Sequence, residues 1–353
     1  MTPDERSSAA YRYDLPPELI AQEPAARRDA SRLMIVDGDR FEDAHFVDLP
    51  RYLNPGDVLV LNETRVIAAR LRGTRGHGGK AELLLLHPAR DDRYDASALG
   101  WIALAKPARR LRDGSRIAFE SGGTARVVRA LGGGMVEVEF QIDGAFETFL
   151  ERAGRLPLPP YIHNESDEAQ RRYQTVFARV PGSVAAPTAS LHFTPELLKT
   201  VAERGVEIVR LTLDVGAGTF RPMTAARIDD HRMHAETYAI SEEAAAAIEA
   251  ARAGRRRIVA AGTTVVRALE GCFAENGRIV AGTGRTDLFI TPGFDFRVVD
   301  AMITNFHLPQ SSLLVLVSAF AGRERILRAY AAAIDRRYRF FSFGDAMLLS
   351  RRS

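Results

Sequence analysis

Short apolar runs separated by glycine or polar turns fill the stretch between residues 58 and 140. Seven runs follow this pattern: Val58–Leu61, Val66–Leu71, Ala81–Leu86, Trp101–Ala105, Arg116–Phe119, Ala125–Ala130 and Val136–Phe140. Evenly spaced short strands of this kind are typical of a small barrel or sandwich. The segment Leu156–Tyr161 contains three prolines, which neither a helix nor a central strand tolerates. We therefore predict an inserted all-β barrel domain over residues 58–155, followed by a connector.

The rhythm changes to alternating helices and strands after about residue 185. Thr194 is placed to cap a helix that starts at Pro195 and ends near Gly205, and Val206–Leu213 then reads as a buried strand. The unit repeats with Ser241 as the cap, Gly254 as the stop and Arg257–Gly262 as the next strand. Such alternation predicts an α/β domain with a parallel or mixed sheet and flanking helices. We assign residues 1–57 and 156–353 to it as one discontinuous catalytic domain.

Composition narrows the class of protein. The 353 residues are 46% hydrophobic, carry a net charge of +3 and include one cysteine, Cys272. These values argue against a disordered chain and against a disulfide scaffold. We see no secretory leader and no apolar run long enough to span a bilayer, so we expect a cytoplasmic protein without membrane contact.

The basic residues are almost all arginine. Only Lys80, Lys106 and Lys199 are lysine among 48 basic residues, and residues 65–129 hold 14 basic against 6 acidic side chains. A GC-rich genome explains a general arginine excess, whereas a local basic stretch is also what a nucleic-acid backbone attracts. The stretch falls within the predicted barrel.

Ligands of α/β sheets bind beyond the carboxyl ends of the strands. The segment Leu213–Phe220 leaves one predicted strand with a Gly-x-Gly turn, which read alone resembles the first motif of S-adenosylmethionine-dependent methyltransferases. Pro222 follows where a helix should begin, so a structural turn remains an alternative. In Ala260–Glu270, Thr263 or Thr264 is placed to cap a helix whose N-terminus favours an anion.

Titratable side chains gather in Asp229–Glu236. Its two histidines and its glutamate suit acid–base catalysis, a structural role or, least of all, a metal site. His192 and His307 stand beside apolar residues and read more readily as hydrogen-bonded core residues. Arg267 and Glu270 are one helical turn apart, so a surface ion pair competes with a substrate-binding role for Arg267. The aromatic residues between 338 and 343 suit core packing or, less readily, base stacking.

Several motifs, in this order and spacing, resemble the S-adenosylmethionine:tRNA ribosyltransferase-isomerase family of queuosine biosynthesis. They are Tyr13–Gln22, Asn62–Ile67, Leu156–Ile162, Gly182–Thr188, Gly216–Pro222, Gly262–Thr264, Asp300–Pro309 and Phe340–Met347. The resemblance implies an α/β domain with an inserted β-barrel. It also implies an enzyme that transfers the ribosyl part of S-adenosylmethionine to 7-aminomethyl-7-deazaguanine in tRNA. Isomerisation then gives epoxyqueuosine-tRNA, adenine and methionine.

The implied reaction needs a base for a C–H beside the sulfonium, a proton donor for adenine and an amine nucleophile, without a metal or redox cofactor. S-adenosylmethionine is therefore expected as a consumed substrate and tRNA as the partner of a monomeric enzyme. The expected residues form three groups. Proton transfer is assigned to Asp214, His231, His234 and Glu236. S-adenosylmethionine binding is assigned to Gly216, Gly218, Thr263, Thr264, Arg267, Asn305 and His307. Contact with tRNA is assigned to Arg65, Lys106 and Tyr161.

Five positions depart from the usual family pattern: Asp214 for His, Val265 for Ser, Ala235 for Ser, Ser190 for Gly and Thr291 for Tyr. A carboxylate in place of an imidazole changes which proton transfers are feasible near neutral pH. A diverged paralogue that uses another nucleophile is therefore an alternative. A methyltransferase and a non-catalytic tRNA-binding protein are less favoured alternatives.

Overall fold

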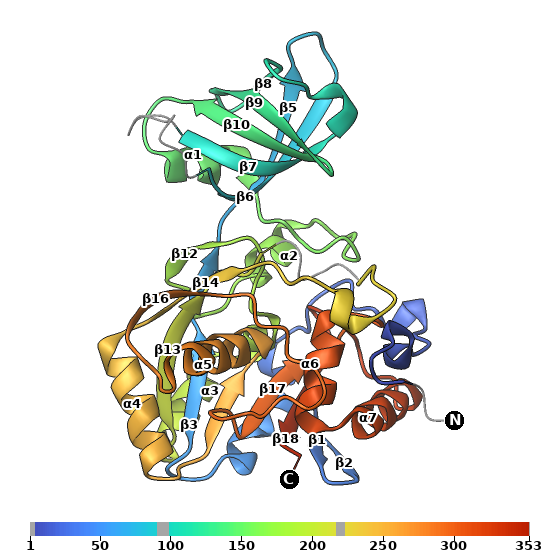
Figure 1. The fold of residues 1–353 in the computed structure, drawn as a ribbon, viewed down its shortest axis with the longest axis vertical. Coiled ribbons are helices and arrows are strands. Elements are labelled where there is room, and N and C mark those ends of the chain that lie inside the picture. Colours follow the sequence, from blue (N-terminus) through green and yellow to red (C-terminus); the bar gives the residue numbers. More distant parts are fainter. Residues whose placement is uncertain (1–3, 90–98, 217–222, 353) are drawn as a thin grey trace. The chain divides into compact units, whose positions relative to one another are not determined.

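The computed structural model describes residues 4–89, 99–216 and 223–352, which form two compact units. The larger unit comprises residues 1–65 and 159–353, and the smaller comprises residues 66–158. The expected α/β domain with an inserted antiparallel barrel is confirmed (Figure 1). None of the helices in the described part of the chain has the length and apolarity to cross a membrane.

The larger unit is built on a mixed nine-stranded sheet in the order β16-β14-β13-β3-β15-β17-β18-β1-β2. The strands are β1 (Arg32–Asp37), β2 (Arg40–His45), β3 (Val58–Asn62), β13 (Glu207–Leu213), β14 (Glu236–Ile240), β15 (Ile258–Ala261), β16 (Gly282–Thr286), β17 (Ala301–Asn305) and β18 (Ala346–Ser350). The helices are α2 (Asp167–Arg172), α3 (Pro195–Glu203), α4 (Glu242–Ala253), α5 (Thr263–Asn276), α6 (Ser312–Ala321) and α7 (Arg323–Asp335). A separate two-stranded pairing joins β4 (Thr64–Val66) to β12 (Val180–Ser183).

Strand β3 lies in the middle of this sheet, parallel to both β13 and β15. Its prediction as the first barrel strand is wrong. All five residues of β3 are buried, with Val58 and Val60 in one core cluster and Leu59 and Leu61 in the other. Helices α4 to α7 cover the first face and α3 covers the second, so both faces of β3 must be apolar. A short apolar run of this kind cannot be distinguished from a barrel strand by its pattern alone.

Local signals placed the helices of this unit well. Thr194 Oγ1 accepts a hydrogen bond from Leu197 N at 3.1 Å, and Ser241 Oγ accepts one from Ala244 N at 3.1 Å, as N-caps do. The C-terminal aromatic residues Tyr338, Phe340, Phe341 and Phe343 are all buried, which favours the core-packing interpretation. The single cysteine, Cys272, is also buried and unpaired with another cysteine.

The smaller unit is a barrel whose strands run in the order β5-β6-β7-β10-β9-β8, closed by pairing of β5 with β8. Its elements are β5 (Arg70–Arg75), β6 (Lys80–Pro88), β7 (Leu99–Lys106), β8 (Arg116–Ala118), β9 (Thr124–Gly132), β10 (Met135–Gln141), α1 (Phe146–Ala153) and β11 (Gly154–Arg155). Phe146 and Phe149 of α1 pack against Phe140, and Phe149 also packs against Phe119. Through these aromatic contacts, α1 packs against the interior of the barrel.

Candidate active site

The carboxyl ends of β13, β3, β15 and β17 meet at one edge of the large sheet, because these four strands run parallel to one another. Strand β14 is antiparallel to β13 and therefore begins at the same edge. We call the side chains gathered here the strand-end site: Asn62, Thr64, Asp214, Glu236, Thr264 and Arg267. Ligands of open α/β sheets bind in this position.

Asn62 joins the ends of two strands. Its side-chain nitrogen donates to Leu213 O at 2.9 Å, and its oxygen accepts from Leu213 N at 3.0 Å and from Thr64 N at 3.1 Å. The side chain is fully buried, so these bonds offset the cost of removing an amide from water. Asn62 thereby fixes the direction in which the chain continues to Asp214.

Asp214 directly follows β13. Its carboxylate accepts a hydrogen bond from Thr64 Oγ1 at 3.0 Å. A Cβ on Gly182 would lie 2.8 Å from both carboxylate oxygens, so any larger residue at that position would force the Asp214 carboxylate to shift. Burial raises the pKa of Asp214, the hydrogen bond from Thr64 lowers it, and the nearby charge of Glu236 raises it. A carboxyl group with a raised pKa is suited to proton transfer.

Glu236 and Arg267 form a buried ion pair, with side chains 6% and 5% exposed. Glu236 also accepts a hydrogen bond from Gly216 N at 3.0 Å, and Arg267 donates to Leu288 O at 3.1 Å. Both carboxylate oxygens of Glu236 are therefore engaged, one by the backbone of the turn that follows Asp214. In this arrangement Glu236 positions the turn, and its expected role in proton transfer stays a prediction.

The alternative of a surface pair between Arg267 and Glu270 is wrong. Glu270 is 1% exposed and accepts backbone hydrogen bonds at 3.0 Å from Arg297, Val298 and Val299. Burial raises the pKa of Glu270, against the lowering effect of these bonds. The guanidinium of Arg267 instead reaches a partner that is 31 residues away in sequence.

Helix α5 begins at the strand-end site but is not capped by a threonine. The N-cap is Gly262, at φ 105°, and no side chain caps the helix. Thr263 and Thr264 lie buried in its first turn, where Thr264 Oγ1 is 3.5 Å from Asn62 Nδ2. Val265, one of the departures from the family pattern, is buried in the core cluster rather than exposed at the site.

The two candidate histidines, His231 and His234, stand shortly before Glu236 in the sequence. His231 packs edge-on against Phe289 at 5.2 Å between ring centres, and partial burial together with His234 lowers its pKa. His234 is exposed. Within the described ranges, no hydrogen bond joins either imidazole to Asp214 or Glu236, and their catalytic role stays a prediction.

Asn305 is the last residue of β17 and His307 stands two residues beyond it, and both side chains make hydrogen bonds within the protein. Asn305 Nδ2 donates to Phe341 O at 2.9 Å. The ring of His307 hydrogen-bonds Thr304 Oγ1 at 2.8 Å through Nε2, and burial lowers its pKa to about 3. Both are placed as core residues, and their expected contact with S-adenosylmethionine stays a prediction.

The residues expected to contact tRNA belong to both units. Arg65 and Tyr161 belong to the larger unit, whereas Lys106 is exposed at the end of β7 in the barrel. Tyr161 is packed inward: its hydroxyl lies 2.7 Å from Ser342 Oγ and its ring 4.8 Å from that of Phe341. Burial raises the pKa of Tyr161.

Gly218 lies outside the described residues. Asn62, Thr64 and Gly182 had no predicted role, although all three stand in motifs that carry the family resemblance. Two features of the sequence could have indicated these residues. Asn62 and Thr64 are polar residues at the end of a buried apolar run, and Gly182 directly follows a proline.

Comparison with known proteins agrees with this geometry. The model of the queuosine biosynthesis protein family matches residues 8–349. Curated relatives named S-adenosylmethionine:tRNA ribosyltransferase-isomerase include those of Moorella thermoacetica and Geobacter metallireducens. The first is 54% identical and the second 50%, and each alignment covers 96% of this chain and 98% of the relative.

A crystal structure of S-adenosylmethionine tRNA ribosyltransferase from Thermotoga maritima is 35% identical. It aligns over 96% of this chain and 99% of that chain, with a TM-score of 0.54. The match of the family model and the length and identity of these alignments place the chain, barrel included, in the queuosine biosynthesis protein family.

Proposed function

We propose that this enzyme transfers the ribosyl part of S-adenosylmethionine to 7-aminomethyl-7-deazaguanine in tRNA and isomerises it. The products are epoxyqueuosine-tRNA, adenine and methionine. The observation that carries this proposal is the near full-length similarity, at 50–54% identity, to relatives that bear the name of this activity. S-adenosylmethionine is a substrate in this reaction, and we propose no additional cofactor.

The strand-end site supplies groups for the proton transfers. Asp214 is the proposed base for the C–H next to the sulfonium, because its carboxyl group stands at the end of β13 with a raised pKa. The hydroxyl group of Thr64 donates a hydrogen bond that orients this carboxylate. The substitution of Asp for the usual His keeps a proton acceptor at the position, so it is compatible with the family reaction.

Other residues hold the substrate or the turn around it. Glu236 and Arg267 fix the amide of Gly216, and the first turn of α5 presents Thr263 and Thr264 at the same edge. The positive end of the α5 dipole faces this edge and favours an electron-rich group there. These contacts support a role in binding S-adenosylmethionine.

The tRNA would be contacted by Arg65 and Lys106, with the basic stretch of the barrel attracting the phosphate backbone, whereas the inward packing of Tyr161 favours a structural role for this residue. We propose that the enzyme acts as a monomer in the cytoplasm, where tRNA is modified.

The test is one incubation of the protein with S-adenosylmethionine and tRNA that carries the deazaguanine, read by mass spectrometry. Adenine, methionine and an enlarged wobble nucleoside in equal amounts are expected. S-adenosylhomocysteine would identify a methyltransferase, and consumption of S-adenosylmethionine with an unchanged wobble base would identify a paralogue with another acceptor. Bound tRNA with intact S-adenosylmethionine would leave only an RNA-binding protein.

A further inference from the structure

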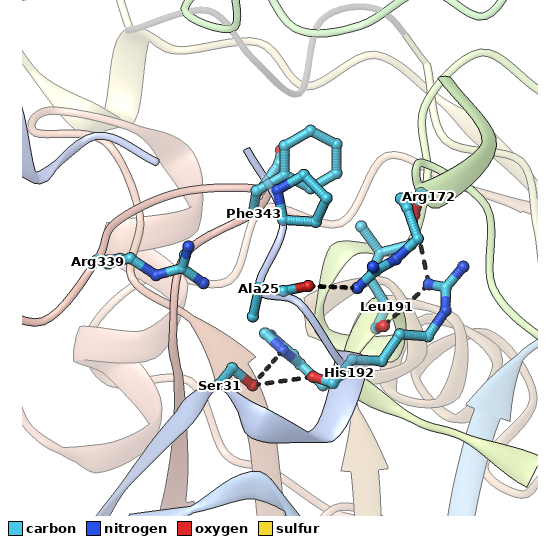
Figure 2. A pocket seen from close by; sticks show the side chains of 11 residues that line it. Ala25, Ser31, Arg172, Leu191, His192, Arg339 and Phe343 are labelled. Carbon is cyan, nitrogen blue, oxygen red and sulfur yellow. Dashed lines mark hydrogen bonds between the residues drawn. The ribbon is translucent and has the colours of Figure 1, made fainter. Parts of the chain in front are cut away.

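A small pocket in the larger unit is lined by three arginines. We call it the arginine pocket, and its lining is Pro24, Ala25, Arg28, Ser31, Arg172, Leu191, His192, Arg339, Ser342, Phe343 and Gly344. Figure 2 shows Arg339 on one side of it and Arg172 on the other, with Ala25 and His192 between them. Segments from both ends of the sequence therefore contribute positive charge to one cavity.

Each of these arginines donates to at least one neutral backbone carbonyl group. Arg28 Nη1 donates to Leu191 O at 3.0 Å and to Arg172 O at 3.3 Å. Arg172 Nη2 donates to Ala25 O at 2.8 Å, and Arg339 Nη1 donates to Glu23 O at 3.1 Å. These bonds fix the guanidinium groups in place without cancelling their charge.

Two carboxylates form long ion pairs with arginines of the pocket. Asp345 approaches Arg339 Nε at 3.8 Å and is shared with Arg32, while Glu168 approaches Arg172 at 3.8 Å with a side chain 66% exposed. Within the described residues, Arg28 has no ion pair. Burial, followed by the charge of Arg172, lowers its pKa to about 10, so it stays charged near neutral pH beside a like charge.

The remaining titratable group in the lining adds no charge. Burial lowers the pKa of His192 to about 3, against a smaller raising effect of Asn305, so the ring is neutral. His192 Nδ1 lies 2.7 Å from Ser31 Oγ, which holds the ring against the pocket wall. The pocket therefore carries an excess of fixed positive charge, and an anion would relieve the repulsion between its arginines.

The size of the cavity limits its occupant. Its volume is about 20 Å³, counted as the space open to the centres of water-sized spheres. One water needs about 10–15 Å³ on this measure, so the cavity suits a single small group of a larger ligand and not a complete small molecule. Planar guanidinium groups bind carboxylate and phosphate oxygens with matching geometry.

The arginine pocket is close to the strand-end site. The 3-10 helix Thr188–His192 connects them: a Cβ on Gly262 would lie 3.6 Å from Ala189 Cβ, and His192 lines the pocket. His192 is three positions after Ala189, which corresponds to about 6 Å along a 3-10 helix. One substrate molecule is long enough to reach both places.

We propose that the arginine pocket binds one oxyanion group of a substrate, namely the carboxylate of S-adenosylmethionine or a backbone phosphate of the tRNA. The identity of the two ligands rests on the proposed function, whereas the preference for an oxyanion rests on the pocket itself.

Arg172→Gln tests this proposal, with Arg171→Gln as the matched control, because Arg171 is the exposed neighbour on the same helix. Arg28→Gln is the second variant, and circular dichroism with urea unfolding verifies that each variant is folded. Affinity is measured by calorimetry for S-adenosylmethionine, for decarboxylated S-adenosylmethionine and for an anticodon stem-loop RNA at several salt concentrations. Inorganic phosphate is titrated separately as a ligand that does not depend on the reaction.

If the pocket binds the carboxylate of S-adenosylmethionine, Arg172→Gln and Arg28→Gln should weaken binding of S-adenosylmethionine by about 10-fold to 150-fold. Decarboxylated S-adenosylmethionine would then bind these variants as it binds the unmodified protein. A phosphate ligand predicts weaker RNA binding and a salt slope reduced by about one.

The proposed function fails if the unmodified protein binds neither S-adenosylmethionine nor RNA. In that case, loss of phosphate binding in Arg172→Gln but not in the control Arg171→Gln still supports the oxyanion site. The proposal is overturned if the Arg172, Arg28 and Arg171 variants bind S-adenosylmethionine, RNA and phosphate with the affinity of the unmodified protein.

Discussion

Replacing Arg267 by methionine would leave the carboxylate of Glu236 buried without its cation. The side chain of Glu236 is 6% exposed, and its remaining bond is the one from Gly216 N. Breaking a buried ion pair by removing one partner costs about 3–5 kcal/mol. Arg267→Met should therefore lower the free energy of unfolding by this amount, a large share of the roughly 5–15 kcal/mol that stabilises a typical domain.

Two further variants test the electrostatic part of this reasoning. Arg328→Met removes the same charge from an exposed pair with Asp39, in which the side chains are 55% and 74% exposed, and should cost less than about 1 kcal/mol. The double variant Arg267→Met, Glu236→Gln replaces the charged acceptor by a neutral one that still accepts from Gly216. It should regain most of the stability that the single variant loses.

Urea unfolding followed by circular dichroism at 222 nm measures these changes, because the larger unit contains α2 to α7 whereas the barrel unit contains α1. The reasoning is refuted if Arg267→Met is no more destabilising than Arg328→Met. It is also refuted if the double variant is as unstable as Arg267→Met, since the loss would then come from packing rather than from the unpaired carboxylate.

Asp214→Asn should lower kcat by about 100-fold or more, measured as adenine release, and unchanged turnover would remove Asp214 from proton transfer. The same variant should be more stable than the unmodified protein at pH 7. The pKa of Asp214 is higher in the folded state, so its ionisation destabilises the fold, and the gain should shrink in unfolding measurements as pH falls through this pKa and vanish below the ordinary pKa of an aspartate. Thr64→Val removes a bond that lowers this pKa, so the acidic limb of kcat/KM against pH should move to higher pH, while Thr64→Ser should leave it in place. Gly182→Ala should displace the carboxyl group of Asp214 and reduce kcat without a change in the circular dichroism spectrum; full activity would contradict the close approach. Lys106→Gln should reduce the salt slope of tRNA binding by about one, and an unchanged slope would exclude a phosphate contact.

The features of this fold that could be predicted are those that depend on residues adjacent in the sequence. The caps at Thr194 and Ser241 are local hydrogen bonds, and both could be predicted from residue type and spacing. The place of β3 could not be predicted, because its burial on both faces depends on helices far away in sequence. Its pattern alone suits a barrel strand equally well.

The candidate site shows the same division. Asp214 and the first turn of α5 follow from the rule that ligands bind at strand ends. The partner of Arg267 does not, since sequence spacing suggests Glu270 one turn away, whereas the antiparallel pairing of β14 with β13 brings Glu236 to the site. The arginine pocket combines residues near 28, 172, 192 and 339, so no local pattern could have indicated it.

An isotope in the substrate measures transfer of the ribosyl group directly. The enzyme is incubated with S-adenosylmethionine labelled with ¹³C in its ribose carbons and with tRNA that carries 7-aminomethyl-7-deazaguanine. We expect the label to appear in the wobble nucleoside while unlabelled adenine and methionine are released in equal amounts. Label that stays in S-adenosylhomocysteine, or a wobble nucleoside without label, would contradict it.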